Sequence, residues 1–279
     1  MTQDNPLPAA PPELLVADGP VRLELHADGV AHVRLDRPEA SNGLNMELLK
    51  ALHEVLMQVH GDGRVRAVLL TGEGKNFCAG GDVHTFLSKG AALPDYIRMA
   101  TSYLQLVVAL LMRLNAPVVC AVQGFAAGGG GMGLVCSSDV VVAGESSKFL
   151  AGATRVAMVP DAGVSVTLTH LVGFRKAMDI LLFNPVIDAA EALRIGLVSR
   201  VVPDAELPAQ ALEMAQQLAA GAPAALAATK RLLWNGLGLG AEAAMPEENR
   251  TQAQLASMTD ALEGLAAVIE KRAPRFTGR

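Results

Sequence analysis

The chain has 279 residues, of which 51% are hydrophobic, and its 23 basic and 28 acidic residues give a formal net charge of -5. This length and composition allow a sizeable core, and the slight acidity gives no general reason to bind nucleic acid or anionic membranes. Three cysteines in no zinc-ribbon or CxxC spacing, and a start (MTQDNPLPAAPPE) without a signal-peptide pattern, predict a reduced cytoplasmic protein with no metal site.

The first 20 residues hold five prolines and little patterned hydrophobicity, which predicts a disordered tail over residues 1–19. Two alternating segments around an Asp28-Gly29 turn then predict a β-hairpin. Apolar residues at helical spacing and short apolar runs continue the alternation of helices and strands. The elements expected in this part are strands at 21–26 and 30–35, a helix at 46–59, a strand at 65–70, a helix at about 95–114, and strands at 117–122 and 139–143.

The last third of the chain carries mainly helical patterns, at 175–182, 189–195, 209–220, 223–234 and 247–271. Alternating strands and helices followed by helices alone are typical of an α/β domain with a helical appendage. The sequence therefore predicts an α/β core over 20–205 and a C-terminal helical region over 206–279.

Residues 116–138 contain no charged residue, so their length alone would suit a membrane span. Six glycines and Pro117 favour instead a buried parallel strand, a glycine loop and the start of an apolar helix. We therefore expect no association with a membrane.

The glycines at 128, 130 and 133 match the GxGxxG pattern of dinucleotide-binding folds, but their surroundings argue against that function. Five residues separate the strand from Gly128, and position 153, where a ribose-binding acid would stand, is alanine. No Gly-Lys-Ser/Thr follows, which excludes a P-loop. The glycines either allow close backbone packing or expose amide groups at a helix N-terminus, where developing negative charge is stabilised.

A second turn with exposed backbone is expected at Phe77-Cys78-Ala79-Gly80-Gly81-Asp82, also between a strand and a helix. Two converging N–H donors would stabilise an enolate or a tetrahedral oxyanion, and each donor typically contributes about a hundred- to a thousandfold in rate. We interpret the two turns as a candidate pair of this kind.

Several motifs together resemble the enoyl-CoA hydratase/isomerase (crotonase) family across residues 20–279. They are LDRPEASNGLN at 35–45, LLTGEGKNFCAGGD at 69–82, PVVCAVQGFAAGGGGMGLVCSSDVVVA at 117–143, RVAMVPDAG at 155–163 and ALRIGLVSRVV at 192–202. The resemblance implies a crotonase-type α/β superhelix of ββα turns, with a helical C-terminal region that assembles homotrimers or hexamers. It also implies that the amides of Ala79 and Gly130 form an oxyanion hole for an acyl-CoA thioester.

The resemblance further implies which residues contact the coenzyme A part of the substrate. They are Ala40, Ala79, Gly80, Gly81 and Asp82 through the backbone, and Lys271 and Phe276 in the ending EKRAPRF. The last two would approach the nucleotide, from the same or from a neighbouring subunit. No separate cofactor is expected.

Hydratases of this family carry two glutamates, at the positions where this chain has Gly133 and Ala153. Positioned acid and base groups contribute about a hundred- to ten-thousandfold each, so efficient hydration is not expected. Asp161 is the carboxylate that remains, in an apolar stretch. It either shuttles a proton with a raised pKa or caps the helix that starts near Gly163.

The segment KFLAGATRVAMVPDAG resembles the branch that includes enoyl-CoA isomerases and phenylacetyl-CoA-type isomerases, which favours catalysis by Asp161. We therefore expect an enoyl-CoA isomerase that shifts a double bond through an enolate held in the oxyanion hole. A hydratase or hydrolase of the same superfamily, or an acyl-CoA-binding protein with little catalysis, are the alternatives.

Five other residues have simpler interpretations. His84 suits a solvated helix start, and Asp139 suits a structural role. Cys78 and Cys136 lie in apolar sequence, as buried thiols do. Ser165 lies in no GxSxG elbow, so no nucleophile is assigned.

Overall fold

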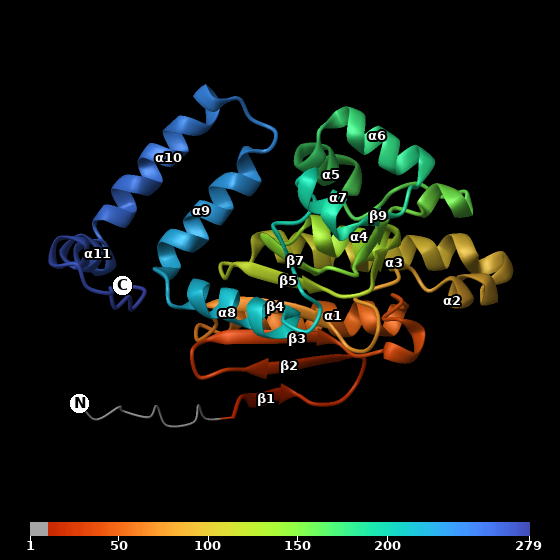
Figure 1. Ribbon diagram of the computed structural model, residues 1–279, viewed down its shortest axis with the longest axis horizontal. Helices are drawn as coiled ribbons and strands as arrows, with labels where there is room; N and C mark the ends of the chain where they lie inside the picture. The colour runs from red at the N-terminus through yellow and green to blue at the C-terminus, as the bar shows by residue number, and fades with distance from the viewer. Residues whose placement is uncertain (1–10) are drawn as a thin grey trace.

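The computed structural model describes residues 11–279, and Figure 1 shows a central sheet covered by helices. The main sheet has the strand order β1 (Glu13–Val16), β2 (Val21–Leu25), β3 (Val30–Leu35), β4 (Ala67–Gly72), β5 (Val118–Val122), β7 (Val140–Gly144) and β10 (Arg200–Val202). The first three strands pair antiparallel, and every later pair is parallel. A smaller sheet joins β6 (Phe125–Ala127), β8 (Lys148–Leu150) and β9 (Ile187–Asp188).

The helices follow the alternation that the sequence predicts and then fill the last third of the chain. They are α1 (Met46–Gly61), α2 (Val83–Ser88), α3 (Leu93–Arg113), α4 (Gly128–Cys136), α5 (Val164–Val172), α6 (Phe174–Phe183), α7 (Ala189–Arg194), α8 (Leu207–Ala219), α9 (Pro223–Gly236), α10 (Ala241–Ala256) and α11 (Thr259–Glu270). The expected α/β core with a helical C-terminal part is confirmed.

One face of the main sheet packs against α1 and α3. Leu23 and Val33 from the strands lie in one cluster with Leu48 and Leu52 of α1 and Val107 of α3. Helix α1 begins where the sequence predicts because the Asn45 side chain accepts a hydrogen bond from the Leu48 amide, which satisfies a donor of the first turn. Its buried residues recur at helical spacing, so this face supplies most of the core.

Helix α8 covers the opposite face of the sheet. Its Leu207 and Ala211 pack against Val30, Leu69 and Val119, which form a second buried cluster. The strands are therefore buried on both faces, which explains their continuous hydrophobicity. Because α8 belongs to the core, the expected core boundary at residue 205 is too early by one helix.

Three further expectations need correction. Residues 1–10 lie outside the described residues, but Glu13–Val16, inside the expected tail, form β1 and pair with β2 because Leu14, Leu15 and Val16 continue the sheet edge. The single helix expected over 247–271 is two helices, α10 and α11, which are separated at 257–258. The glycine loop is not a loop, because Gly128–Cys136 already form α4.

The last three helices form an arm that stands apart from the core in Figure 1. Asp139 anchors this arm, because its carboxylate accepts hydrogen bonds from the Val118 amide at 2.7 Å and the Trp234 indole at 2.8 Å. It also pairs with the buried Lys230 ammonium at 2.7 Å. The structural role expected for Asp139 is confirmed.

Within residues 11–279, no helix combines the length and the hydrophobicity needed to cross a bilayer. The uncharged segment 116–138 is divided between β5, β6 and α4, as its glycines and Pro117 predict.

Candidate active site

A cavity of about 560 Å³ lies beside the N-terminus of α4. Both glycine turns and Asp161 contribute to its wall, and the remaining wall is mainly apolar. The apolar residues come from the segments around α1, α2 and α3 and from the chain between β8 and α5: Leu44, Leu49, Val83, Phe86, Ile97, Ala100, Leu104, Leu150, Val156, Met158 and Val159. The cavity wall is therefore mainly apolar, with backbone groups of the two glycine turns and the Asp161 carboxyl group as polar features.

The two glycine turns pack directly against each other. A methyl group on Gly80 would lie 2.6 Å from the Ala127 carbonyl oxygen, and one on Gly130 would lie 3.4 Å from the Gly80 Cα atom. The Gly80 backbone also has a φ of +91°, which disfavours any side chain. The two turns that the sequence singles out therefore lie side by side.

Gly130 lies in the cavity wall, and its amide belongs to the first turn of α4. It is the third residue of α4, and the first four amides of a helix have no partner inside the helix. Within residues 11–279 its N–H donates to no backbone group outside α4. The amide also lies at the positive end of the helix dipole, where developing negative charge is stabilised.

The second turn does not offer the amide that the sequence analysis predicts. Ala79 lies in the cavity wall, but its N–H donates to the Ser41 carbonyl oxygen at 2.9 Å. The prediction that this amide is free to bind a substrate oxygen is therefore wrong. Two residues later Gly81 also lies in the wall, and across residues 11–279 its N–H donates to no carbonyl or side chain.

The hydrogen bonds of the neighbouring residues explain why the Gly81 amide has no partner among the described residues. The Gly80 carbonyl accepts a hydrogen bond from the Leu44 amide at 2.7 Å, and the Asp82 amide donates to the Leu44 carbonyl at 3.1 Å. This short parallel bridge uses the groups on either side of the Gly81 N–H. A methyl group on Gly128 would lie 3.7 Å from the Gly81 nitrogen, so this amide lies close to the first turn of α4.

Asp161 lies in the cavity wall with its carboxylate against Gly129, because a side chain on Gly129 would overlap the carboxylate oxygens. No side chain caps the N-terminus of α5, which follows Gly163. The alternative in which Asp161 caps this helix is therefore wrong. Burial raises the pKa of Asp161 above its ordinary value, because the ionised carboxylate loses solvation.

Asp161 and Arg155 are the ionisable side chains of the cavity wall within the described chain. Arg155, which the sequence analysis did not single out, donates to the Asn184 carbonyl oxygen at 2.6 Å. Ala153 lies in the wall as well, and Gly133 is buried in α4. The two positions where family hydratases carry glutamate thus add no carboxylate.

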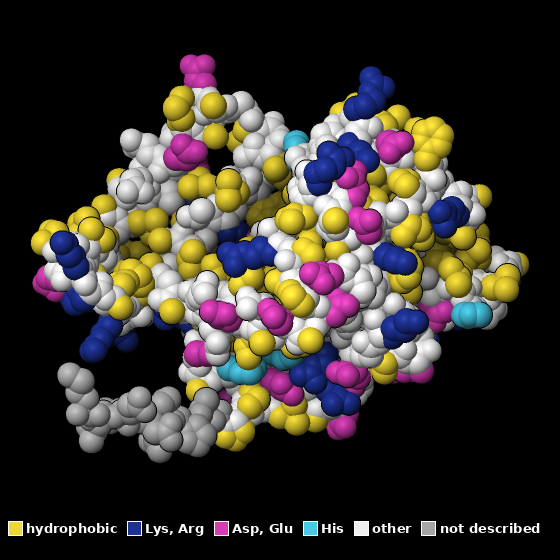
Figure 2. Space-filling model, viewed as in Figure 1, with side chains coloured by type: hydrophobic (Ala, Val, Ile, Leu, Met, Phe, Trp, Pro, Cys, Tyr) yellow, Lys and Arg dark blue, Asp and Glu magenta, His cyan; other side chains and the backbone are white. Residues whose placement is uncertain are grey.

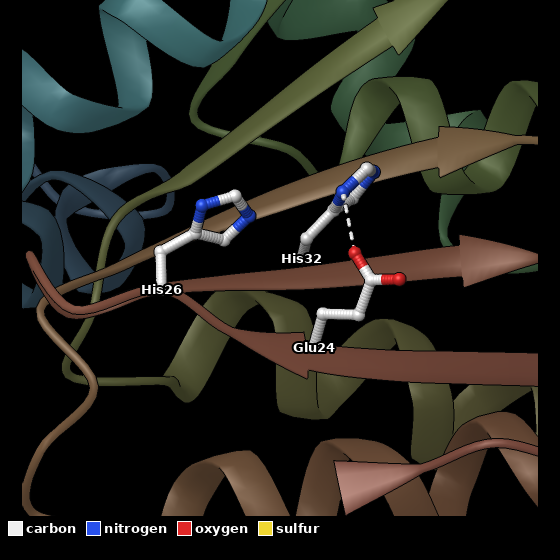
Figure 3. Close-up of side chains that lie close together, drawn as sticks. All are labelled: Glu24, His26 and His32. Atoms are coloured by element: carbon white, nitrogen blue, oxygen red, sulfur yellow. Dashed lines mark ion pairs between the residues drawn. The ribbon is translucent and has the colours of Figure 1, made fainter. Parts of the chain in front are cut away.

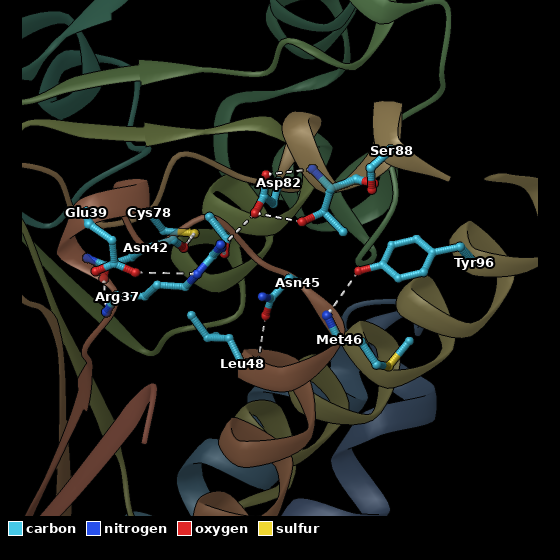
Figure 4. Close-up of polar contacts among 12 residues, drawn as sticks. Arg37, Glu39, Asn42, Asn45, Met46, Leu48, Cys78, Asp82, Ser88 and Tyr96 are labelled. Carbon is cyan, nitrogen blue, oxygen red and sulfur yellow. Dashed lines mark hydrogen bonds and ion pairs between the residues drawn. The ribbon is translucent and has the colours of Figure 1, made fainter. Parts of the chain in front are cut away.

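A polar network holds the loop that carries Gly81 (Figure 4). The Asp82 carboxylate accepts from the Thr85 amide at 3.0 Å, which caps α2, and pairs with Arg37 at 2.8 Å. Burial alone would raise the pKa of Asp82, but the bonds from Thr85 and Arg37 outweigh it and lower the pKa. The Asn42 amide group donates to three backbone carbonyls of the same loop. The Asp82 side chain therefore shapes the loop.

Phe86 is a cavity residue that the sequence analysis missed. A methyl group on Gly81 would lie 2.5 Å from the Phe86 ring, so this ring covers the Gly81 backbone. The ring also makes an edge-on contact with Tyr96, at 6.0 Å between centroids. The Tyr96 hydroxyl accepts from the Met46 amide at 3.1 Å. This chain of contacts joins α1, α2 and α3 around the cavity.

Five residues expected to contact coenzyme A lie outside the cavity wall: Ala40, Gly80, Asp82, Lys271 and Phe276. Ala40 ends a short 3-10 turn. Lys271 follows α11 in a left-handed conformation, and Phe276 lies in the C-terminal tail near Gly264. Contact of Lys271 and Phe276 with a nucleotide, from this or a neighbouring subunit, stays a prediction.

The other residues behave as their simpler interpretations predict. Cys78 and Cys136 are buried, and burial raises the pKa of each thiol to about 12. Such thiols are not nucleophiles near neutral pH. His84 and Ser165 are exposed and are not part of the cavity wall.

Comparison with known proteins gives a consistent result. The family model described as enoyl-CoA hydratase/isomerase matches residues 26–279. A Rhodobacter capsulatus protein described as a probable enoyl-CoA hydratase is 38% identical over 93% of this chain and 98% of its own length. The 1,2-epoxyphenylacetyl-CoA isomerase of Escherichia coli is 32% identical over 90% of this chain and 96% of its own. The crystal structure of an enoyl-CoA hydratase from Bacillus anthracis superposes with a TM-score of 0.88 at 31% identity, covering 93% of this chain and all of the other.

Proposed function

This chain belongs to the enoyl-CoA hydratase/isomerase family, and on that premise we propose that it moves a carbon–carbon double bond within an unsaturated acyl-CoA thioester. The observation that carries this proposal is Asp161, the one carboxylate in the cavity wall among the described residues. Double-bond migration needs a single group that takes and returns a proton, whereas the two glutamates of family hydratases have no counterpart here.

The thioester carbonyl is proposed to lie between the amides of Gly81 and Gly130. When a proton leaves the adjacent carbon, negative charge develops on the carbonyl oxygen. Two preorganised N–H donors stabilise that charge in a site from which water is largely excluded. The packing of Gly80 on the first turn of α4 supports the convergence of these two donors.

Asp161 is proposed to carry the proton. As a carboxylate it would take a proton from C2 of a 3-enoyl thioester, which leaves a dienolate, and it would return that proton to C4 to give the 2-enoyl product. Its raised pKa suits this exchange, because a general base works best when its pKa approaches the working pH. The absence of a cap interaction leaves the carboxylate free for this role.

The apolar cavity wall suits a neutral acyl chain.

The arm formed by the last three helices suits assembly into a homotrimer or hexamer. Figure 2 shows hydrophobic side chains over the arm, and four residues of α11 are 64% to 81% exposed: Leu262, Leu265, Val268 and Ile269. Exposed apolar surface of this kind marks protein interfaces. In such an assembly, Lys271 and Phe276 are proposed to reach a neighbouring subunit's coenzyme A.

Two substrates separate the proposed reaction from hydration. We expect trans-3-hexenoyl-CoA to be converted to the 2-enoyl isomer, and crotonyl-CoA to be hydrated much more slowly, when both products are quantified by NMR. In D₂O, transfer of the same proton from C2 to C4 would give product that is incompletely deuterated at C4. Rapid hydration with no isomer formed would contradict the proposal.

A hydratase is the second candidate, because the Rhodobacter and Bacillus relatives carry that name. The name of the Escherichia coli relative instead supports isomerase chemistry within the same family. Tight binding of acyl-CoA without turnover of either substrate would indicate the third alternative, a binding protein.

A further inference from the structure

Three potential metal ligands cluster on the sheet away from the cavity. Glu24 lies on β2, His26 directly after it, and His32 on β3 (Figure 3). Their ligand atoms all lie within 4.8 Å of one another, and the His32 Nδ1 atom lies 3.8 Å from Glu24 Oε2. Ligands at about 2.0 to 2.2 Å from a tetrahedral ion are roughly 3.4 Å apart. Small side-chain rotations would therefore close the cluster around one ion.

The hydrogen bonds of His32 select the tautomer that such a site needs. An Arg34 guanidinium nitrogen lies 3.4 Å from His32 Nδ1, and because guanidinium can only donate, Nδ1 must carry the lone pair. The proton then lies on Nε2, which is 2.9 Å from the Thr71 hydroxyl oxygen. A metal-binding histidine characteristically donates its second ring N–H to a neighbouring acceptor, which orients the ring.

His26 supplies an independent observation. Its Nε2 atom is buried and has no hydrogen-bond partner among the described residues. A buried polar atom without a partner is costly, and such an atom calls for an explanation. The His26 and His32 ring centroids are 6.3 Å apart, so an ion between the rings would pair with this nitrogen.

We propose that Glu24, His26 and His32 bind a divalent cation of the zinc type. Two imidazoles and one carboxylate form a ligand set that suits Zn²⁺, with a water as the fourth ligand. The three side chains are only partly buried, so an ion can reach them from solvent. None of them lies in the cavity wall, so this site joins β2 to β3 without taking part in catalysis.

Arg34 makes the proposal unusually testable. Its guanidinium lies 3.6 Å from Glu24 Oε2, so it competes with a cation for the same lone pairs. It also lies 3.7 Å from Glu73, which can hold it when an ion enters. Arg34 therefore weakens metal binding, and its removal strengthens it.

Calorimetric titration of Zn²⁺ into untagged, chelator-treated protein, with Co²⁺ absorption spectra as a second readout, tests the site. We expect one Zn²⁺ per chain and a tetrahedral Co²⁺ spectrum. Thr71→Val removes a hydrogen-bond partner of a ligand and should weaken zinc binding by about ten- to a hundredfold. Glu24→Gln and His26→Asn each remove a ligand and should weaken zinc binding by more than that. Arg34→Met should tighten binding by about tenfold.

His84→Gln is the matched control, because His84 is exposed on α2 and should leave zinc binding unchanged. Circular dichroism of every variant separates lost binding from lost folding, and the tighter binding of Arg34→Met cannot arise from misfolding. Absence of stoichiometric binding in the wild type, or an affinity unaffected by Glu24→Gln and Arg34→Met, would overturn the proposal.

Discussion

The Asp161 carboxylate occupies the space that a side chain on Gly129 would fill. Gly129 is the second residue of α4, next to Gly130, whose amide is proposed to hold the substrate oxygen. The same helical turn therefore sets both the donor and the position of the acid.

This contact predicts a kinetic effect of Gly129→Ala. The new methyl group would displace the Asp161 carboxylate, and misplacement of a catalytic group by about 1 Å can cost about a hundredfold. We expect kcat for 3-enoyl-CoA isomerisation to fall by about that factor, with little change in acyl-CoA affinity. Gly61→Ala is the control, because a methyl group there meets nothing within 4 Å. Equal kcat values for the two variants would contradict the role of this contact.

The raised pKa of Asp161 predicts how stability changes with pH. Because the folded protein holds the Asp161 proton more tightly than the unfolded chain, ionisation costs stability as the pH rises above the ordinary aspartate pKa. Asp161→Asn removes that cost. We expect its melting temperature to exceed that of the wild type at neutral pH, and the difference to vanish below the ordinary aspartate pKa. A constant difference across this range would argue against burial of the charge.

The anchor of the arm can be tested at Asp139. Burial lowers the pKa of Lys230, and the Asp139 carboxylate opposes this shift. Removing one partner of a buried ion pair typically costs about 3 to 5 kcal/mol, so Asp139→Asn should lower the free energy of unfolding by about that amount. The double variant with Lys230→Met should recover part of the loss in urea denaturation. A loss below about 1 kcal/mol would mean that the pair behaves as an exposed one.

The exposed surface of α11 predicts self-association. Light scattering should give three or six times the mass of one chain, and Ile269→Asp, at a residue 81% exposed, should shift the mass toward the monomer. Leu14→Asp, at an exposed residue of β1 outside the arm, should leave the assembly unchanged. A monomeric wild type would exclude the proposed assembly.

Much of the fold follows from local patterns. The Asp28-Gly29 turn, the helical spacing in α1 and the apolar runs of β4 and β5 predict elements within two residues of those observed. Two kinds of element were missed. The strands β6, β8, β9 and β10, each of two or three residues, are too short for a periodic signal, and β1 depends on pairing with β2. Tertiary pairing, which local sequence does not encode, creates these strands.

The sequence identified the turns that line the candidate site but not which amide of the second turn is without a hydrogen-bond partner in the described chain. The motif identified the loop that holds Gly81, yet the donor direction depends on the Ala79 bond to Ser41, a contact between segments 38 residues apart in number. Asp161 could be selected because it remains after Gly133 and Ala153 are set aside. The Glu24, His26 and His32 cluster matches no common zinc spacing, and only the pairing of β2 with β3 reveals it.

The most direct test of the proposed reaction is the single-turnover rate of trans-3-hexenoyl-CoA isomerisation by wild type and Asp161→Asn, with acyl-CoA affinity measured for both. We predict that the variant binds the thioester normally and isomerises it about a hundred- to ten-thousandfold more slowly. An Asp161→Asn rate equal to that of an active wild type would show that another group moves the proton and would contradict this account.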